Sequence, residues 1–238
     1  MSVDLLAIAA HRDDVELTCA GTLIKAAKHG RKTAVIDLTA GEMGTKGDAR
    51  SRAAEAEKAA AVMKLSAREN LGLPDAAIVN DPATRTLVAR AIRRFKPRVV
   101  IAPARQGRHP DHRVTSELVR DACFIAGLAK VAPDVPKHRP TKVLHCISYR
   151  QDFEKPTFVV DISDEFEQKL EAIKCFGSQF DDATQAGEVN PTGEPLYDAI
   201  RHYAAYYGAM IRTRYGEPFF TTETMRVDDV VALEVSTF

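Results

Sequence analysis

Short strand-like segments alternate with helix-like segments over the first half of this chain, and this alternation restricts its fold more than any other feature. The expected strands are Asp4–Ala10, Thr33–Thr39, Arg68–Leu73 and Val99–Ala102. The expected helices are Val15–His29, Ala49–Lys64, Thr84–Phe95 and Asp111–Gly127. The first strand is an almost continuous apolar run, which is typical of a strand buried on both faces. The alternation predicts an α/β, Rossmann-like fold, with a mostly parallel sheet and helices on both faces.

The second half of the chain is less regular. We expect strands at Lys142–Ser148 and Thr157–Ile162, a loop at Gln185–Glu194, a helix at Pro195–Tyr215 and a weak edge strand at the extreme C-terminus. Asp164 and Glu167 have the spacing of a capping box for a helix that runs to about Cys175. No repeat, low-complexity tract or Gly/Ser linker marks a boundary, so residues 1–238 are expected to form a single domain.

Charge and composition exclude several classes of protein. The 238 residues include 33 basic and 33 acidic side chains, so no long-range field favours nucleic acid or an anionic membrane. No run of about 18 apolar residues is present, and the first residues lack the basic segment of a signal peptide. The four cysteines form no CxxC pair, which favours reduced, buried thiols over disulfides or a thiolate zinc site. We therefore expect a cytoplasmic protein that binds neither nucleic acid nor membranes.

Two polar clusters, His11–Glu16 and Arg108–His112, follow predicted strands. They fall at the carboxyl ends of those strands, where a doubly wound sheet binds its ligands. Imidazole and carboxylate side chains suit a zinc-type divalent ion. A tight turn can aim His11 and Asp14 at one point, and His112 can supply a third ligand from the start of a later helix. Two histidines and one aspartate leave one coordination position for water, as a catalytic zinc requires.

Three further residues of these clusters suit roles in hydrolysis. Asp13 can accept a proton from an activated water, and His109 can stabilise the oxyanion of a tetrahedral intermediate. Asp111 is close enough in sequence to orient a histidine by hydrogen bonding. The alternative is that the first cluster only begins a helix, because carboxylates are stabilised at helix N-termini.

The two clusters resemble the paired motifs of the PIG-L/LmbE-like family of zinc-dependent N-deacetylases. The family pattern AHPDDxE corresponds to Ala10–Glu16 here, and the pattern HPDH corresponds to His109–His112. The similarity continues through Asp37–Thr39, Gly41–Gly47, Leu71–Asp75, Ser178–Phe180 and Tyr206–Phe219. The late matches resemble the branch that contains the bacillithiol-biosynthesis deacetylase, which acts on N-acetylglucosaminyl-malate.

The resemblance implies that His11, Asp14 and His112 bind one zinc ion per chain, with other divalent metals as alternatives. It implies that Asp13 is the general base and that His109 is the electrophilic residue that stabilises the oxyanion. These roles agree with those that the chemistry of the side chains suggests.

Two arginines extend this comparison. Arg52 matches the family arginine that helps to hold the substrate, a role that the residue pattern alone does not suggest. The usual family proline between the first two ligands is Arg12 here, so the turn lacks the fixed φ of proline. We expect either that neighbouring packing holds this turn, or that Arg12 pairs with a carboxylate of the substrate.

The expected function is removal of an acetyl group from an N-acetylglucosamine conjugate, with N-acetylglucosaminyl-malate in bacillithiol biosynthesis as the implied substrate. The alternatives are an amidase on a related sugar–thiol conjugate, a non-catalytic sugar- or nucleotide-binding module, and an oligomeric scaffold. Gly41–Gly47 lacks the pattern of a phosphate-binding loop and is expected to be a mobile loop on the substrate side. We expect a homo-oligomer. The stripe of Tyr203, Tyr206, Tyr207 and Met210 is expected to be helix core or, alternatively, a subunit contact.

Overall fold

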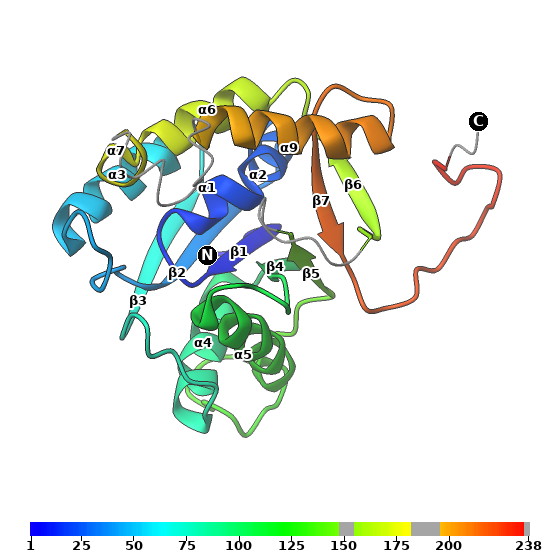
Figure 1. The fold of residues 1–238 in the computed structure, drawn as a ribbon. Coiled ribbons are helices and arrows are strands. Elements are labelled where there is room, and N and C mark those ends of the chain that lie inside the picture. Colours follow the sequence, from blue (N-terminus) through cyan, green and yellow to red (C-terminus); the bar gives the residue numbers. More distant parts are fainter. Residues whose placement is uncertain (148–154, 182–195, 236–238) are drawn as a thin grey trace.

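The structure, a computed structural model, describes residues 1–147, 155–181 and 196–235 (Figure 1). A seven-stranded sheet with the order β3-β2-β1-β4-β5-β7-β6 forms its centre. The strands are β1 (Leu5–Ala9), β2 (Thr33–Thr39), β3 (Ala67–Leu73), β4 (Val99–Pro103), β5 (Lys142–Cys146), β6 (Phe158–Asp161) and β7 (Gly216–Phe220). The first five strands pair in parallel, and β7 lies antiparallel between β5 and β6. This confirms the predicted α/β fold with a mostly parallel sheet.

Helices cover both faces of the sheet (Figure 1). They are α1 (Asp14–Thr18), α2 (Ala20–Lys28), α3 (Ala49–Val62), α4 (Pro82–Phe95), α5 (Pro110–Ala126), α6 (Phe166–Lys174), α7 (Gly177–Phe180) and α9 (Leu196–Met210). Helices α4 and α5 pack on one face, and α1, α2, α3, α6 and α9 lie on the other. Within the described ranges, no helix combines the length and apolar content needed to cross a bilayer.

The central strand β1 is buried on both faces. Leu6 and Ile8 belong to the apolar cluster under α4 and α5, whereas Ala7 and Ala9 face the opposite cluster with Leu23 of α2. Burial of an aliphatic side chain of this size contributes about 1.5–3 kcal/mol. The small side chains of Ala7 and Ala9 line a cavity on the α1 side of the sheet. The apolar run of β1 therefore both builds the core and leaves space next to α1.

The first predicted helix is wrong in one respect, because it is two helices, α1 and α2, separated at Cys19 (φ −140°). The carboxylate of Glu217 in β7 accepts hydrogen bonds from the backbone N–H groups of Gly21 (2.9 Å) and Thr22 (2.7 Å). Lys169 of α6 pairs with the same carboxylate at 2.6 Å. A buried anion from a distant strand therefore supplies the N-terminal cap that a second helix requires. The end of α2 is as predicted, with Gly30 at φ +76°.

The predicted capping box at Asp164 and Glu167 is also wrong. Helix α6 has Glu165 as its N-cap, with no side-chain cap hydrogen bond. The Glu165 carboxylate instead pairs with Lys28 Nζ at 2.8 Å. An ion pair to another helix has therefore replaced the local cap.

The C-terminal part differs from prediction as well. The long helix ends at Met210, and Gly216–Phe220 forms β7 inside the sheet, whereas residues 221–235 form no strand. The predicted tyrosine stripe is only partly core, because Tyr207 is buried but Tyr206 is 60% exposed and Met210 is 46% exposed. The predicted loop at Gln185–Glu194 lies outside the described residues.

Candidate metal centre

The fold brings the two polar clusters together. Strand β1 ends at Ala9 and leads through a turn into α1, while β4 leads through a loop into α5. Because β1 and β4 are adjacent parallel strands, with Ala7 paired to Ile101, both clusters emerge at the same edge of the sheet. Side chains 101 residues apart in the sequence, His11 and His112, consequently come within hydrogen-bond distance.

His11, Asp14 and His112 converge as predicted for a metal site. His11 Nδ1 lies 3.2 Å from His112 Nε2 and 3.4 Å from Asp14 Oδ2. His112 Nε2 lies 3.0 Å from Asp14 Oδ1. Four ligands at the usual zinc distances of about 2.0–2.1 Å stand about 3.3–3.4 Å apart in a tetrahedron. Since the observed separations are close to this value, the three side chains fit a zinc-type ion.

Two carboxylates orient His11 from its other side. His11 Nε2 lies 3.0 Å from Asp75 Oδ1 and 3.5 Å from Asp111 Oδ2, which leaves Nδ1 facing Asp14. Asp111 also accepts a hydrogen bond from the backbone N–H of Ala76 at 2.8 Å. A carboxylate on the distal nitrogen fixes the orientation of a metal-binding histidine. Asp111 thus contacts His11, its role in orienting the ring stays a prediction, and Asp75 is a further candidate that the sequence reasoning missed.

The site favours positive charge. Burial alone would lower the pKa of His11, but the charge of Asp14 and hydrogen bonds with Asp14 and Asp75 raise it to about 11. Burial alone would raise the pKa of the Asp14 carboxyl, but the charges of His112 and His11 hold it well below its usual range. A buried cluster that stabilises protonated imidazoles stabilises a divalent cation by the same field.

His109 belongs to a second set of possible ligands, with His11 and Asp111. Its Nδ1, however, accepts a hydrogen bond from the backbone N–H of Asp111 at 3.2 Å. The neutral ring therefore carries its proton on Nε2, as a hydrogen-bond donor. Burial and the charges of His11 and His112 lower the pKa of His109, which favours this neutral form. These contacts suit a donor to substrate better than a metal ligand.

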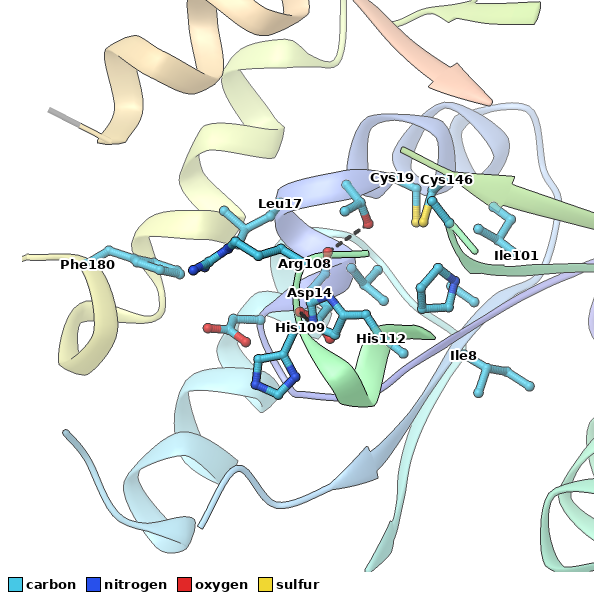
Figure 2. A pocket seen from close by; sticks show the side chains of 17 residues that line it. Ile8, Asp14, Leu17, Cys19, Ile101, Arg108, His109, His112, Cys146 and Phe180 are labelled. Atoms are coloured by element: carbon cyan, nitrogen blue, oxygen red, sulfur yellow. Dashed lines mark hydrogen bonds and ion pairs between the residues drawn. The ribbon is translucent and has the colours of Figure 1, made fainter. Parts of the chain in front are cut away.

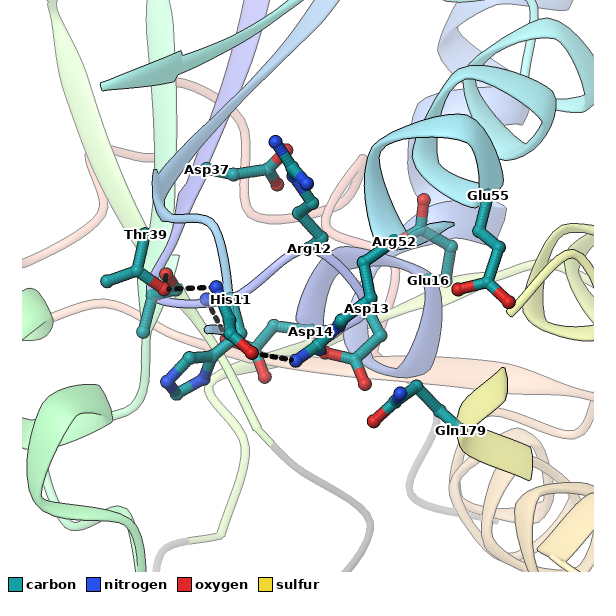
Figure 3. A network of polar contacts seen from close by, with 12 residues as sticks. His11, Arg12, Asp13, Asp14, Glu16, Asp37, Thr39, Arg52, Glu55 and Gln179 are labelled. Atoms are coloured by element: carbon teal, nitrogen blue, oxygen red, sulfur yellow. Dashed lines mark hydrogen bonds and ion pairs between the residues drawn. The ribbon is translucent and has the colours of Figure 1, made fainter. Parts of the chain in front are cut away.

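Asp13 is held beside the metal ligands by Arg52 of α3 (Figure 3). Arg52 Nη2 lies 3.2 Å from Asp13 Oδ1, and Nη1 donates to the backbone carbonyl of Gly41 at 2.9 Å. Gly41 has φ +72°, and a Cβ at this position would collide with the Arg52 guanidinium. The loop after β2 therefore needs glycine here, and Arg52 connects that loop to Asp13. Its predicted contact with substrate stays a prediction.

Two cavities meet at this cluster. The inner one, about 190 Å³, extends along α1 to Cys146 and Phe180 (Figure 2). The outer one, about 300 Å³, is lined by Met43 and Gly44 of the loop after β2 and by Asp75. Both cavities share four lining residues: Asp13, Asp14, His109 and His112. A small substrate can therefore reach the candidate metal ligands and the candidate base together.

Comparison with known proteins agrees with this geometry. Residues 6–123 match the family model PIG-L, described as GlcNAc-PI de-N-acetylase. The chain is 29% identical over 225 residues to a diacetylchitobiose deacetylase of Thermococcus kodakarensis, covering 90% of this chain and 80% of that protein. The chain belongs to the PIG-L family.

Solved structures place this PIG-L family protein among others of the same fold. The conserved protein TT1542 from Thermus thermophilus is 36% identical with a TM-score of 0.85, covering 95% of this chain and 98% of that chain. The 4-carboxy-2-hydroxymuconate hydratase GalB from Pseudomonas putida is 20% identical with a TM-score of 0.81, covering 96% of this chain and 99% of that chain. This second similarity shows the fold alone.

Arg12, where the family usually has proline, lines neither cavity. Its guanidinium donates to the backbone carbonyl of Ala49 at 2.6 Å. Its own backbone carbonyl accepts a hydrogen bond from Arg68, which also pairs with Glu16 at 2.6 Å and Asp37 at 2.8 Å. The buried Arg68 thus holds the turn in the absence of proline. Contact between Arg12 and a substrate carboxylate stays a prediction.

Proposed function

We propose that this protein is a metal-dependent amide hydrolase that removes the acetyl group from an N-acetylglucosamine-type substrate. The observation that carries the proposal is the convergence of His11, Asp14 and His112 within about one ion's coordination sphere, beside Asp13 and His109. The family description and the chitobiose deacetylase relative support this reaction and this class of sugar. The fold itself does not decide the reaction, because a hydratase shares it.

His11, Asp14 and His112 would hold the ion, which when bound supplies a Lewis acid for the amide carbonyl and lowers the pKa of water. The side chain of Asp13 accepts a proton as the water oxygen adds to the acetyl carbon. The Nε2–H of His109 donates to the carbonyl oxygen as that oxygen becomes negative. Asp13 then returns the proton to the amine nitrogen as the C–N bond breaks. Acetate and a free amine are the products.

Arg52 supports the base in this scheme. Its guanidinium lies 3.2 Å from the Asp13 carboxylate and is itself held by the carbonyl of Gly41. This contact keeps the Asp13 carboxylate aimed at the cluster, as a general base requires.

The finer proposal for the substrate is N-acetylglucosaminyl-malate, as in bacillithiol biosynthesis. It is supported by the resemblance in the late part of the chain and by Arg108, which lines the inner cavity. Arg108 makes no ion pair with any residue in the described part of the chain, so its guanidinium is available for a substrate carboxylate. The competing substrate is a related sugar–thiol conjugate that carries an acyl group other than acetyl.

A substrate panel tests the proposal. Amine release is measured from N-acetylglucosaminyl-malate, N,N'-diacetylchitobiose, an N-acetylglucosaminyl inositol and a conjugate with a longer acyl group. The protein is used after chelation, and again after addition of zinc, iron(II) or cobalt(II). We expect release only with metal and fastest from the malate conjugate. A protein that binds metal in a 1:1 ratio yet releases no amine from any of these would overturn the function.

A further inference from the structure

Helix α7 contributes to both cavities at the candidate metal centre. Phe180, which is buried, lines the inner cavity (Figure 2). Gln179 Nε2 donates a hydrogen bond at 2.7 Å to the backbone carbonyl of Lys46, in the loop after β2. Met43 of the same loop lines the outer cavity. The position of α7 therefore affects a wall of each cavity.

This helix is too short to hold its position by its own hydrogen bonds. It spans only Gly177–Phe180, and its N-cap residue, Phe176, makes no side-chain cap hydrogen bond. Isolated helices shorter than about 12 residues are only marginally stable in water. Tertiary contacts must therefore fix α7, and the packing of Phe180 in the apolar cluster under α3 and α6 is one of them.

The polar contact that fixes α7 comes from Glu55 of α3. Its carboxylate accepts hydrogen bonds from the backbone N–H of Ser178 at 2.7 Å and from Ser178 Oγ at 2.8 Å. The two bonds use both carboxylate oxygens, and bonds to a carboxylate are about twice as strong as those between neutral groups. Figure 3 shows the side chain of Glu55 directed from α3 toward α7. Glu55 thus also supplies an acceptor for an N–H group in the first turn of α7.

The same helix holds the candidate base. Arg52, one turn before Glu55 on α3, contacts Asp13 at 3.2 Å. Residues three apart lie on the same face of a helix. One face of α3 is therefore connected to the candidate base through Arg52 and to the walls of both cavities through Glu55.

We propose that Glu55 is a positioning residue for substrate binding, which fastens α7 through Ser178 and so places Phe180 and the loop after β2 around the substrate. The inference rests on the proposed function, because it takes the sugar substrate to occupy the two cavities at the candidate metal centre. Glu55 itself lines neither cavity, so it acts through α7. Loss of its contact should weaken substrate binding more than the chemical step, since Asp13, His109 and the candidate metal ligands are unchanged.

A fluorescent reporter tests whether Glu55 fastens α7. The chain contains no tryptophan, so Phe180→Trp introduces a single reporter at the wall of the inner cavity. In this background, Glu55→Ala should move the emission to longer wavelength and increase its quenching by acrylamide, because the indole gains contact with water. Glu57→Ala, which removes an exposed carboxylate of the same helix, should change neither property. Unchanged emission and quenching in Glu55→Ala would overturn the inference.

Kinetics of the protein without the reporter test the effect on substrate binding. With the fastest substrate of the panel, Glu55→Ala should raise KM about tenfold, the scale of one lost hydrogen bond to a charged group. We expect kcat to change less than about threefold, and zinc affinity, measured by competition with a chelator, to stay the same. Ser178→Ala, a milder change, should raise KM less, and should add nothing further to Glu55→Ala because both variants break the same contact.

Three results would overturn this role of Glu55. One is an unchanged KM in Glu55→Ala, and another is a loss of zinc affinity as large as the rise in KM, which would indicate general disorder of the site. The third is additive effects of Glu55→Ala and Ser178→Ala on KM. Absence of amine release from the unchanged protein would overturn the proposed function and, with it, the role in substrate binding, whereas these three results overturn only the inference about Glu55.

Discussion

At the scale of single residues, the candidate site depends on how side chains are aimed. His11 has carboxylates on both sides, with Asp75 and Asp111 at Nε2 and Asp14 at Nδ1. The sequence pattern indicates which residues carry the chemistry, but it does not show that Asp75, in the turn after β3, touches His11. The sequence does place Asp75 just after the carboxyl end of a predicted strand, at the edge of the sheet where ligands bind, and this position could have indicated a role for it.

Asp13→Asn should separate catalysis from metal binding. Because the amide cannot accept a proton, kcat should fall about a hundredfold or more. Metal content should stay at one ion per chain, because His11, Asp14 and His112 are unchanged. Amine-release kinetics and elemental analysis of the same sample measure the two properties. Asp14→Asn is the matched comparison and should lose metal together with activity, whereas full activity in Asp13→Asn would contradict the mechanism.

Asp75→Asn should weaken metal binding without removing a ligand. Loss of a carboxylate that orients a metal-binding histidine usually lowers affinity about 10–100-fold. Competition with a chromophoric chelator measures this affinity. At saturating metal, kcat should change far less than in Asp13→Asn. Asp48→Asn, at the exposed N-cap of α3, is the control. An unchanged affinity in Asp75→Asn would mean that Asp75 does not position His11.

At the scale of elements, buried charges join helices and loops that are distant in sequence. Glu217 of β7 caps α2 and pairs with Lys169 of α6. Arg93 of α4, only 1% exposed, donates to the backbone carbonyl of Ala126 at the end of α5 at 2.9 Å and to carbonyls in the segment after α5, including that of Leu128 at 2.7 Å. The carbonyls of Val131 (2.5 Å) and Val135 (2.9 Å) also accept from Arg93, and for these two the described residues provide no other donor.

Arg93→Met should destabilise the fold strongly. The substitution keeps much of the volume but leaves the carbonyls of Val131 and Val135 without a donor among the described residues, each at a cost of about 1–3 kcal/mol. We expect a total loss of about 3–5 kcal/mol in the free energy of unfolding, at the upper end of single substitutions. Urea unfolding measures it. Arg94→Ala on the same helix, where an exposed arginine pairs with Glu69, should change it by less than about 1 kcal/mol. Equal effects of the two substitutions would refute the role of Arg93.

At the scale of the whole molecule, the candidate metal centre joins elements from the start, middle and end of the Rossmann-like half. His11 follows β1, Asp75 follows β3, and His112 lies in α5. An ion that binds only the folded chain would therefore stabilise the whole molecule.

Zinc should raise the unfolding temperature of the chelated protein. At a free concentration 100-fold above Kd, binding adds about 2.7 kcal/mol to the free energy of unfolding. Differential scanning calorimetry across a zinc titration measures the shift. Asp14→Ala should abolish it, while Arg94→Ala should retain it. A shift of equal size in Asp14→Ala would show that zinc stabilises the protein from another site.

The sequence by itself determined the strands of the parallel sheet, both polar clusters and the candidate metal ligands. These depend on local periodicity and on the rule that neighbouring parallel strands end at one edge. Only the tertiary structure decided that Glu217 divides the first helix, that β7 enters the sheet and that Arg52 holds Asp13. Each of these features depends on a partner that is distant in the sequence. A buried charge or strand must be paired, but the sequence does not indicate which distant residue or strand is its partner.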